Sequence, residues 1–415
     1  MNRHKFHKER REHLLPNQPS KSGKVTRITE LRARRRARYV RTGLLIAAAL
    51  VLLVLYAMGA YGKPMALLGD LLESASISLQ PGAGFPSKTG ISDPLQIESL
   101  AGGFVELGSS DVIVVSSAGN QLRTIAHTYA RPAITAGNTR FALYSRSGYD
   151  LRVESRTRTL YTHVFSQPIL LAEMSSGGNL AVVTDSNRYL AELTVYNIAF
   201  EPVYTWYPTE KEGTPSRVAF AADGKRMAVA CLKSEEGSLS TNIHLLDTRK
   251  NEIEVSIPVV GSAALQLRWL DSRLLLVIFQ NKAAVYDMNT GEETAVYSYG
   301  GDQLASASVS GQNTALLLGP DLDKLSARLV ILDAKMQEKA VQTVAAPNTG
   351  VVCTRSGAYV LKSHSVMAYN LAGEQLWEME LDTQPLAVLD TQKLLVFESG
   401  WVRQLKKPGT QAEAD

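Results

Sequence analysis

The sequence predicts an all-β domain, an eight-bladed β-propeller, preceded by one transmembrane helix. Two observations predict this arrangement. The stretch from Gly43 to Tyr61 contains nineteen residues without a charge, long enough for one bilayer crossing. From Leu95 onward, short β-branched and aromatic runs alternate with turn dipeptides, and the turns recur about every 40 residues. Seven blades is the alternative, if the divergent first segment is counted differently.

Composition indicates a large globular domain joined to a basic arm. Of the 415 residues, 45% are hydrophobic and 20% charged, which are globular values. Residues 1–41 contain 14 Lys/Arg and 3 Asp/Glu, a net charge of +11, whereas the remaining 374 residues contain 30 and 37, a net charge of −7. This uneven distribution of charge argues against nucleic-acid binding by the domain that follows the arm, because that domain is acidic. The two cysteines, Cys231 and Cys353, exclude a disulfide framework and a Cys-rich zinc site, and buried free thiols are expected.

Residues 1–41 are predicted to form a largely disordered cytoplasmic tail, and residues 42–62 the transmembrane helix. Nineteen helical residues at 1.5 Å each extend about 28 Å, close to the roughly 30 Å hydrocarbon thickness of a bilayer. Basic residues before the apolar stretch set the orientation, because cytoplasmic flanks are enriched in Lys and Arg. These residues are Arg34, Arg35, Arg36, Arg38 and Arg41. The C-terminal domain is therefore predicted to be extracytoplasmic, at the cell membrane.

Two alternatives to this interpretation stay open. A cleaved signal peptide is the first, but the 41-residue basic region and the nineteen-residue apolar stretch are both too long for one. Nucleic-acid binding by the Arg-rich run at 31–41 is the second. The position of that run beside the apolar stretch favours contact with anionic lipid headgroups instead. The predicted partner of the tail is thus the lipid bilayer, and no nucleic-acid partner is expected.

Residues 63–94 are predicted to be a juxtamembrane helix and a linker, because the segment 80–94 is rich in Gly, Pro and Ser. The run SISLQ at 76–80 is a candidate for the strand that closes the ring. The propeller is predicted to occupy residues 95–407, and residues 408–415 a disordered C-terminus.

The first hairpin of each repeat joins a strand to a more apolar second strand through a tight turn. The equivalent turn positions are Gly137, Gly178, Gly224, Ser272, Gly311, Gly357 and Gln392, at spacings of 41, 46, 48, 39, 46 and 35 residues. Periods near 40 with four strand-sized runs each are typical of propeller blades. The predicted blades cover residues 95–128, 129–166, 167–210, 211–260, 261–300, 301–345 and 346–381, with a last set of three strands at 382–407.

The second hairpin of a repeat contains a turn led by Asp or Asn, as in YDMNTGEE (286–293) and YNLAGEQ (369–375). Asp and Asn side chains bond the backbone two residues on, and Gly291 and Gly373 accept a positive φ without steric cost. The inner strands are almost wholly apolar, which indicates burial on both faces between neighbouring blades. In a β-sandwich, apolar and polar residues would alternate in nearly every strand, without the change from apolar inner strands to alternating outer strands.

These turns carry a resemblance to known propellers. FAADGKRMAVA (220–230) resembles the S-P-D-G-K turn of WD40-like propellers, and the two Asp/Asn-led hairpins resemble the D-x-x-T-G-x-x-x-W hairpin of quinoprotein-like propellers. The whole layout over about residues 25–405 is similar to an uncharacterised family of single-span, membrane-anchored propellers of Gram-positive bacteria. The resemblance implies the fold and little about activity. Trp377 matches the hairpin tryptophan, but Tyr297 replaces it in the other copy, so no quinone cofactor is expected.

A search for catalytic motifs in the sequence finds none. It contains no G-x-S-x-G, H-E-x-x-H, Walker loop or C-x-x-C pattern. The histidines of the repeats are scattered over four blades and are expected to be structural. Asp321 and Asp323 form a D-x-D pair, but a calcium loop needs further ligands, so a solvated acidic loop is favoured. No catalytic residue, cofactor or metal is therefore predicted.

A candidate binding surface combines an aromatic-rich region with the long links of one face of the ring. Eight of the sixteen tyrosines lie between residues 129 and 207, and aromatic residues are enriched at interfaces. The links 208–214, 233–241 and 319–327 are long and would emerge on one face. The candidate residues are Tyr189, Tyr204, Trp206, Tyr207, Glu235, Glu236, Asp321 and Asp323. Packing between blades is the alternative role for the aromatic residues.

The sequence thus favours a non-catalytic protein-interaction scaffold or sensor that binds an envelope protein. Two other functions stay open. One is a propeller enzyme (a hydrolase, lyase or quinone-dependent dehydrogenase) with its site in the central funnel, which requires charged groups from several blades to converge on one pocket with perturbed pKa values. The other is a glycan-binding propeller.

Overall fold

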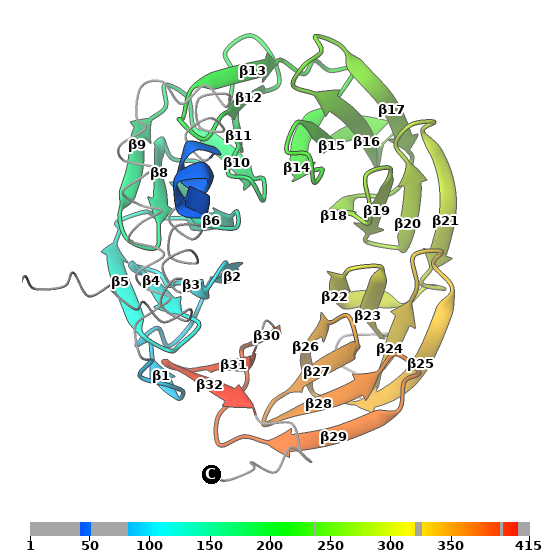
Figure 1. Cartoon of the computed structure of the whole chain (residues 1–415). Coiled ribbons are helices and arrows are strands. Elements are labelled where there is room, and N and C mark those ends of the chain that lie inside the picture. The colour runs from blue at the N-terminus through cyan, green and yellow to red at the C-terminus, as the bar shows by residue number, and fades with distance from the viewer. Residues whose placement is uncertain (1–41, 51–81, 236, 320–325, 391–392, 406–415) are drawn as a thin grey trace, which may run out of the picture. The chain divides into compact units, whose positions relative to one another are not determined.

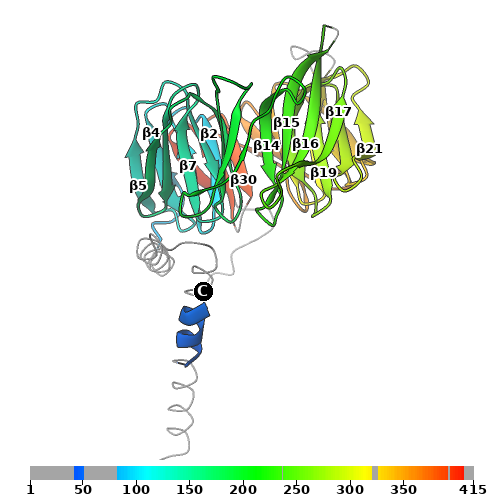
Figure 2. The same ribbon diagram turned by 90° about the horizontal axis from the view of Figure 1, so that it is seen from above.

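The computed structural model describes residues 42–50, 82–235, 237–319, 326–390 and 393–405. The chain divides into two compact units, residues 1–57 and 58–415. Residues 42–50 of the first unit are helical (Figure 2). No helix within these ranges has the length and hydropathy needed to cross a membrane. The predicted tail, most of the predicted span, the segment 63–81 and the C-terminus from residue 406 lie outside the described residues.

The second unit is built from eight four-stranded antiparallel sheets that follow one another around a ring (Figure 1). Blade 1 contains β2 (Gln96–Leu100), β3 (Gly103–Leu107), β4 (Asp111–Ser116) and β5 (Gln121–Ala126). Blade 2 contains β6 (Pro132–Ala136), β7 (Arg140–Ser145), β8 (Asp150–Ser155) and β9 (Thr159–Val164). Blade 3 contains β10 (Ile169–Met174), β11 (Leu180–Thr184), β12 (Glu192–Tyr196) and β13 (Pro202–Trp206). Blade 4 contains β14 (Thr214–Phe220), β15 (Arg226–Glu235), β16 (Ser238–Asp247) and β17 (Ile253–Val259).

The second half of the ring repeats the same order of strands. Blade 5 contains β18 (Ala264–Trp269), β19 (Leu274–Phe279), β20 (Lys282–Asp287) and β21 (Glu292–Ser298). Blade 6 contains β22 (Gln303–Ser310), β23 (Asn313–Gly319), β24 (Ser326–Leu332) and β25 (Glu338–Ala345). Blade 7 contains β26 (Asn348–Cys353), β27 (Gly357–Lys362), β28 (Ser365–Asn370) and β29 (Gln375–Glu380). Blade 8 contains β30 (Ala387–Asp390), β31 (Leu394–Glu398), β32 (Trp401–Leu405) and, from the N-terminal side of the ring, β1 (Ser87–Lys88). The prediction of an all-β, eight-bladed propeller is confirmed.

The ring is closed in blade 8, where strands from both ends of the domain pair. Ser87 lies opposite Val402, and Lys88 opposite Trp401. This two-residue strand falls inside the segment that the sequence predicts as linker. The predicted closing strand at 76–80 lies outside the described residues. Pro86 and Gly90 on either side give the segment the composition of a turn. A strand of two residues is too short to show an alternating pattern, so the sequence does not reveal it.

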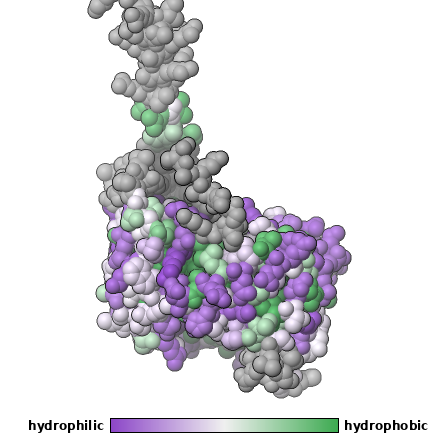
Figure 3. Space-filling view, turned by 90° about the horizontal axis from the view of Figure 1, so that it is seen from below, coloured by the Kyte–Doolittle hydropathy of each residue, from purple (hydrophilic) through white to green (hydrophobic). Residues whose placement is uncertain are grey.

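The core lies between neighbouring blades, because alternate residues of a central strand face opposite neighbours. In β15, Met227, Val229 and Cys231 pack into the cluster shared with blade 3. Ala228 and Ala230 of the same strand pack into the cluster shared with blade 5. All five are fully buried. This two-sided burial explains why the central strands contain unbroken apolar runs, such as residues 227–232 of β15. The outer edge of the ring, in contrast, shows hydrophilic residues mixed with smaller apolar patches (Figure 3).

The Asp- and Asn-led turns form as predicted. The Oδ1 atom of Asp287 accepts a hydrogen bond from the Asn289 amide at 2.9 Å, and Oδ1 of Asn370 accepts one from the Ala372 amide at 3.0 Å. Gly291 and Gly373 follow these residues with φ values of 81° and 80°. Local side-chain chemistry therefore fixes the turn between the third and fourth strands of these blades.

One predicted loop is instead part of a long hairpin. The segment 233–241 continues β15 and β16, in which Lys233 pairs with Ser240 and Ser234 with Leu239. Gly237, with a φ of 80°, lies in the turn. Figure 2 shows this hairpin extending beyond the neighbouring blades. Alternating Ser, Leu and Thr residues suit a two-stranded ribbon, so the insertion lengthens the strands rather than the link.

Replacing Gly357 with alanine is expected to destabilise the domain by about 2 kcal/mol or more, the range of strong steric strain. A Cβ atom at this first residue of β27 would lie 1.9 Å from the Tyr369 carbonyl oxygen of the adjacent strand. Urea unfolding of Gly357→Ala and Gly177→Ala measures the effect. Gly177 lacks a positive φ, and a Cβ atom there would meet no atom nearer than 4.0 Å, so its variant should stay within about 0.5 kcal/mol. Equal stabilities for the two variants would contradict the strand packing.

Candidate functional site

One face of the ring carries the links between second and third strands and the links from each blade to the next. We call it the link face. Antiparallel connection of four strands brings these two kinds of link to the same end of every blade. Tyr189 lies in the link between β11 and β12, and Tyr207 directly follows β13. Their rings lie 5.0 Å apart and remain 43% and 45% exposed. The structure therefore brings two of the predicted residues together as an exposed aromatic pair.

Two other predicted residues, Tyr204 and Trp206, do not join this pair. Tyr204 and Trp206 are half-buried on β13 and pack against the core shared by blades 3 and 4. The Trp206 ring also meets the edge of His244 of blade 4, with centroids 5.7 Å apart. These two aromatic residues thus have the inter-blade packing role that the sequence left as an alternative. Glu235 ends β15. Glu236, Asp321 and Asp323 lie outside the described residues.

Further apolar side chains are exposed at the link-face ends of blades 2 to 5. They occur in the links or at the strand ends next to them. These residues are Tyr149, Val164, Leu190, Leu239, Val260 and Leu265. Together with Tyr189 and Tyr207 they form what we call the apolar band. Sequence reasoning included Tyr149 only as one of the eight tyrosines between residues 129 and 207, and it missed the other five, because an isolated apolar residue in a link or at a strand end follows no period.

A second candidate site lies along the axis of the ring. Two adjoining cavities of about 380 and 300 Å³ are lined by the inner strands of blades 1 to 5. Both cavities are lined by Glu98 of β2, Glu173 of β10 and Arg268 of β18. Three charged side chains from three different blades therefore face one axial space, which is the size of a small-molecule pocket. The funnel-enzyme alternative requires such a convergence of charged groups.

Burial perturbs the pKa values of both carboxyl groups, and repulsion by Glu98 adds to the effect on Glu173. Burial raises the pKa of Glu173 to about 7, and the nearby charge of Glu98 adds to this rise. Burial also raises the pKa of Glu98, while Arg268 lowers it in part. The Thr135 hydroxyl donates a long hydrogen bond of 3.4 Å to Glu173 Oε2. Within the described residues, Arg268 makes no ion pair closer than 4 Å with either carboxylate, so the three groups interact only at longer range.

The inner strands next to the cavity are held together by side chains rather than by backbone ladders. Gln96 Oε1 accepts a hydrogen bond from the Ile134 amide of blade 2 at 2.9 Å. The Thr135 hydroxyl accepts one from the Met174 amide of blade 3 at 2.9 Å. Each bond satisfies an inner-edge amide that has no strand partner on the axial side. Glu98 and Glu173 therefore project from a fixed wall.

Cys231 and Cys353 are free and buried, as predicted. Burial raises the pKa of Cys353 to about 11 and that of Cys231 further, so both are neutral thiols at pH 7. His244 is held by Ser256, with Nδ1 and Oγ 2.9 Å apart, and fills a structural position. In the described part of the chain, no group of three or more His, Cys, Asp or Glu side chains could hold a metal ion.

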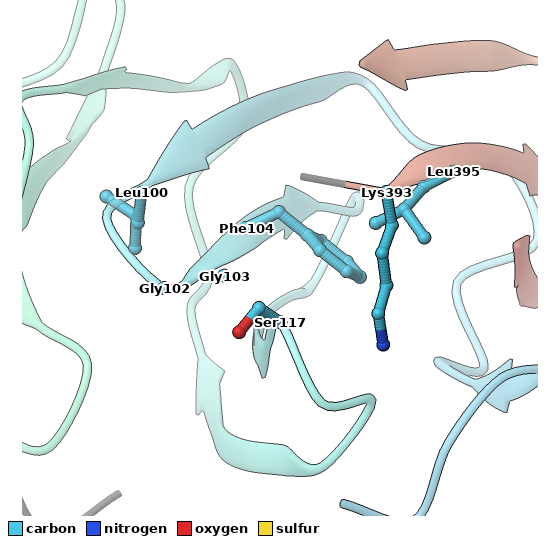
Figure 4. Close-up of a pocket in the computed structure, with 7 residues that line it drawn as sticks. All are labelled: Leu100, Gly102, Gly103, Phe104, Ser117, Lys393 and Leu395. Atoms are coloured by element: carbon cyan, nitrogen blue, oxygen red, sulfur yellow. The ribbon is translucent and has the colours of Figure 1, made fainter. Parts of the chain in front are cut away.

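A third cavity of about 100 Å³ lies at the junction of blades 8 and 1. Figure 4 shows Phe104 of β3 pointing toward Leu395 of β31, with Lys393 beside them. Ligand pockets are usually about three times larger or more. This cavity is therefore a packing gap in the closing junction of the ring.

Comparison with known proteins supports the fold. The chain is similar to BamB from Moraxella catarrhalis at 13% identity, covering 78% of this chain and 98% of that chain with a TM-score of 0.53. It is similar to the computationally designed Ika8 protein at 11% identity, covering 77% and 97% with a TM-score of 0.55. Apo AztD from Citrobacter koseri matches at 10% identity, covering 71% and 87% with a TM-score of 0.51. Identities this low establish the propeller fold alone. No protein with a curated description matches the chain.

Sequence comparison also identifies a family. The match extends over residues 87–406, from the ring-closing strand β1 to the residue after β32. It confirms the predicted resemblance to a propeller family without an assigned role. The chain belongs to DUF5711, a family of unknown function.

Proposed function

We propose that this protein is a non-catalytic, membrane-anchored propeller that binds an envelope protein on the link face of blades 2 to 5. The apolar band is the observation that carries the proposal. Its members Tyr189, Leu190 and Tyr207 belong to blade 3, and exposed Leu239 lies in the long β15–β16 hairpin of the next blade. Exposed apolar side chains that gather on one face of a folded domain mark interaction surfaces.

The residue types of the band suit a protein partner. Tyr189 and Tyr207 offer large rings with few rotatable bonds, a composition enriched at protein interfaces. Exposed Arg146, Arg188 and Lys211 lie in the same links and would form a polar rim. The acidic balance of residues 42–415 does not suit nucleic acid.

The membrane anchor and the extracytoplasmic location form part of the proposal. The uncharged stretch 43–61 and the Arg-rich residues before it support them, as does the resemblance to anchored propellers of Gram-positive bacteria.

Because Cys231 and Cys353 are buried, a Gln375→Cys variant would present one exposed thiol on outer strand β29. We expect a membrane-impermeant maleimide to label this variant in intact cells. Labelling that requires cell lysis would contradict the orientation.

The double variant Tyr189→Ala/Tyr207→Ala is expected to weaken partner binding at least about tenfold, the effect of removing interface hot spots. Affinity capture from solubilised envelopes with the full-length wild type and the variant measures the loss. Leu376→Ala, on the exposed outer strand of blade 7, is the control and should bind as the wild type does. Equal recovery with the tyrosine variant and the wild type would contradict a role for the link face.

The axial cavity favours an enzyme as a second candidate function. A carboxyl group with a pKa of about 7, as in Glu173, is suited to general acid–base catalysis at neutral pH. The candidate class is a hydrolase or lyase that uses Glu173 as acid or base, with Arg268 stabilising negative charge. Assays of the full chain with chromogenic ester and glycoside substrates test it. Turnover that Glu173→Gln removes would support an enzyme, and absence of turnover would argue for the binding function.

A further inference from the structure

We propose that the axial cavity binds a small zwitterion, an amino acid or short peptide, whose ammonium is held by Glu98 and Glu173 and whose carboxylate is held by Arg268. This inference goes beyond partner binding on the link face and does not depend on it. The juxtaposition of unlike charges from three blades around one cavity carries it.

The three charged groups are not used by the fold itself. The buried carboxylate of Glu154, by comparison, is paired with Arg123 at 3.0 Å and with Arg152 at 2.7 Å. Within the described residues, Glu98, Glu173 and Arg268 form no such ion pair, although Glu173 feels the charges of Glu98 and Arg268, and Glu98 feels that of Arg268. Holding partly buried charges apart costs free energy, and a ligand that carries the complementary charges recovers it.

The two carboxyl groups favour a cationic nitrogen. They lie on blades 1 and 3, on either side of blade 2. Burial raises the pKa of Glu173, and repulsion by Glu98 adds to this rise. An ammonium group placed between them supplies three donors and removes that repulsion. Thr135 bridges only one carboxylate oxygen and leaves the other acceptor sites facing the cavity.

Arg268 is the arginine that lines both cavities, whereas Arg146 lines only the smaller one. Arg217 also lines the cavity, but its Nε donates to the Leu265 carbonyl at 2.7 Å and its guanidinium also donates to the Ser216 carbonyl at 2.7 Å. Arg268 lies on the opposite side of the ring from blade 1, on β18, and is exposed to the cavity. A guanidinium group binds a carboxylate through two parallel hydrogen bonds, so Arg268 fits the acidic end of the ligand.

The cavity has room for such a ligand and adjoins the link face. The two adjoining cavities, of about 380 and 300 Å³, are each larger than a single amino acid and suit a short peptide. Leu265, next to the link-face end of β18, lines the smaller cavity. Exposed Leu265 is also a member of the apolar band, so a ligand in the cavity would lie next to the partner-binding surface.

Isothermal titration calorimetry on the purified full chain tests the inference, with L-alanyl-L-alanine as the probe. We expect saturable binding of the dipeptide. We expect binding at least about tenfold weaker for N-acetyl-alanyl-alanine, which lacks the ammonium, and for alanyl-alanine amide, which lacks the carboxylate, because each loses a charge-assisted contact. Glucose, a neutral polyol, is titrated as well, to test the alternative that the cavity binds an uncharged ligand.

Variants of the cavity complete the test. Glu173→Gln and Arg268→Lys should each weaken dipeptide binding at least about tenfold, whereas Glu380→Gln on the exposed edge of β29 should not. Thermal unfolding shows whether each variant folds, and Glu98→Gln replaces Glu173→Gln if that variant does not. No saturable dipeptide binding, equal binding of the capped forms, binding of glucose alone, or unchanged binding by the folded variants would overturn the inference.

Discussion

Replacing Phe104 with alanine is expected to lower the free energy of unfolding by about 3–5 kcal/mol, the usual cost of truncating a fully buried phenylalanine. Phe104 of blade 1 meets Phe397 of blade 8 edge to face, with ring centroids 5.0 Å apart. Both side chains are fully buried. The pair lies where the first and last blades meet, so its loss weakens closure of the whole ring. Urea denaturation followed by circular dichroism measures the change.

A matched control and a double mutant separate closure from general loss of apolar surface. Leu376→Ala removes a side chain that is 59% exposed on an outer strand and should change stability by less than about 0.5 kcal/mol. The Phe104→Ala/Phe397→Ala double variant should reveal a coupling energy of about 0.5–1.5 kcal/mol between the rings. A loss under about 1 kcal/mol for Phe104→Ala would show that the blades do not close through this contact.

Replacing Glu106 with glutamine is expected to stabilise the protein above neutral pH by up to about 3 kcal/mol, the equivalent of its pKa shift. Glu106 of β3 is fully buried, and neither carboxylate oxygen has a hydrogen-bond partner in the described structure. Burial raises its pKa from 4.5 to about 7. The folded state therefore keeps the proton between pH 4.5 and 7, while the unfolded state releases it. The stability contribution of this group is full below pH 4.5 and is lost as the pH rises through 7.

Unfolding by urea at several pH values between 4.5 and 8 gives the comparison. The wild type should lose stability relative to Glu106→Gln as the pH rises, and the two should approach each other near pH 4.5. Because Glu173 titrates in both proteins, the difference between them isolates Glu106. Glu380→Gln, at an exposed site, should follow the wild type at every pH. Parallel curves for the wild type and Glu106→Gln would show that Glu106 is ionised in the folded state.

The blades were predictable because their signals are local. Glycines at turn positions and the Asp287 and Asn370 turns are determined by neighbours within four residues. Strands buried on both faces, such as β15, can be recognised in the sequence by their unbroken apolar runs. The closing strand Ser87–Lys88 carries no such signal, since two residues have no period.

The candidate sites were predictable only in part. Tyr189 and Tyr207 came from the clustering of tyrosines between residues 129 and 207, and the structure places these two together. Tyr204 and Trp206 are aromatic too, but they lie on strand β13. The strand directs their side chains into the packing between blades 3 and 4. Glu98, Glu173 and Arg268 lie far apart in the sequence and meet only because the ring closes. One signal could have found the last two, since they stand five and four residues before the equivalent turn positions Gly178 and Ser272.

Site-specific photo-crosslinking tests the central claim, partner binding on the link face, most directly. A benzophenone amino acid placed at Tyr189 or Leu239 is irradiated in living cells of the source organism, with the same residue at Leu376 of the outer strand as the comparison. We predict one discrete adduct, to the same envelope protein, from both link-face positions and none from position 376. Adducts from all three positions alike, or from none, would contradict binding on this face.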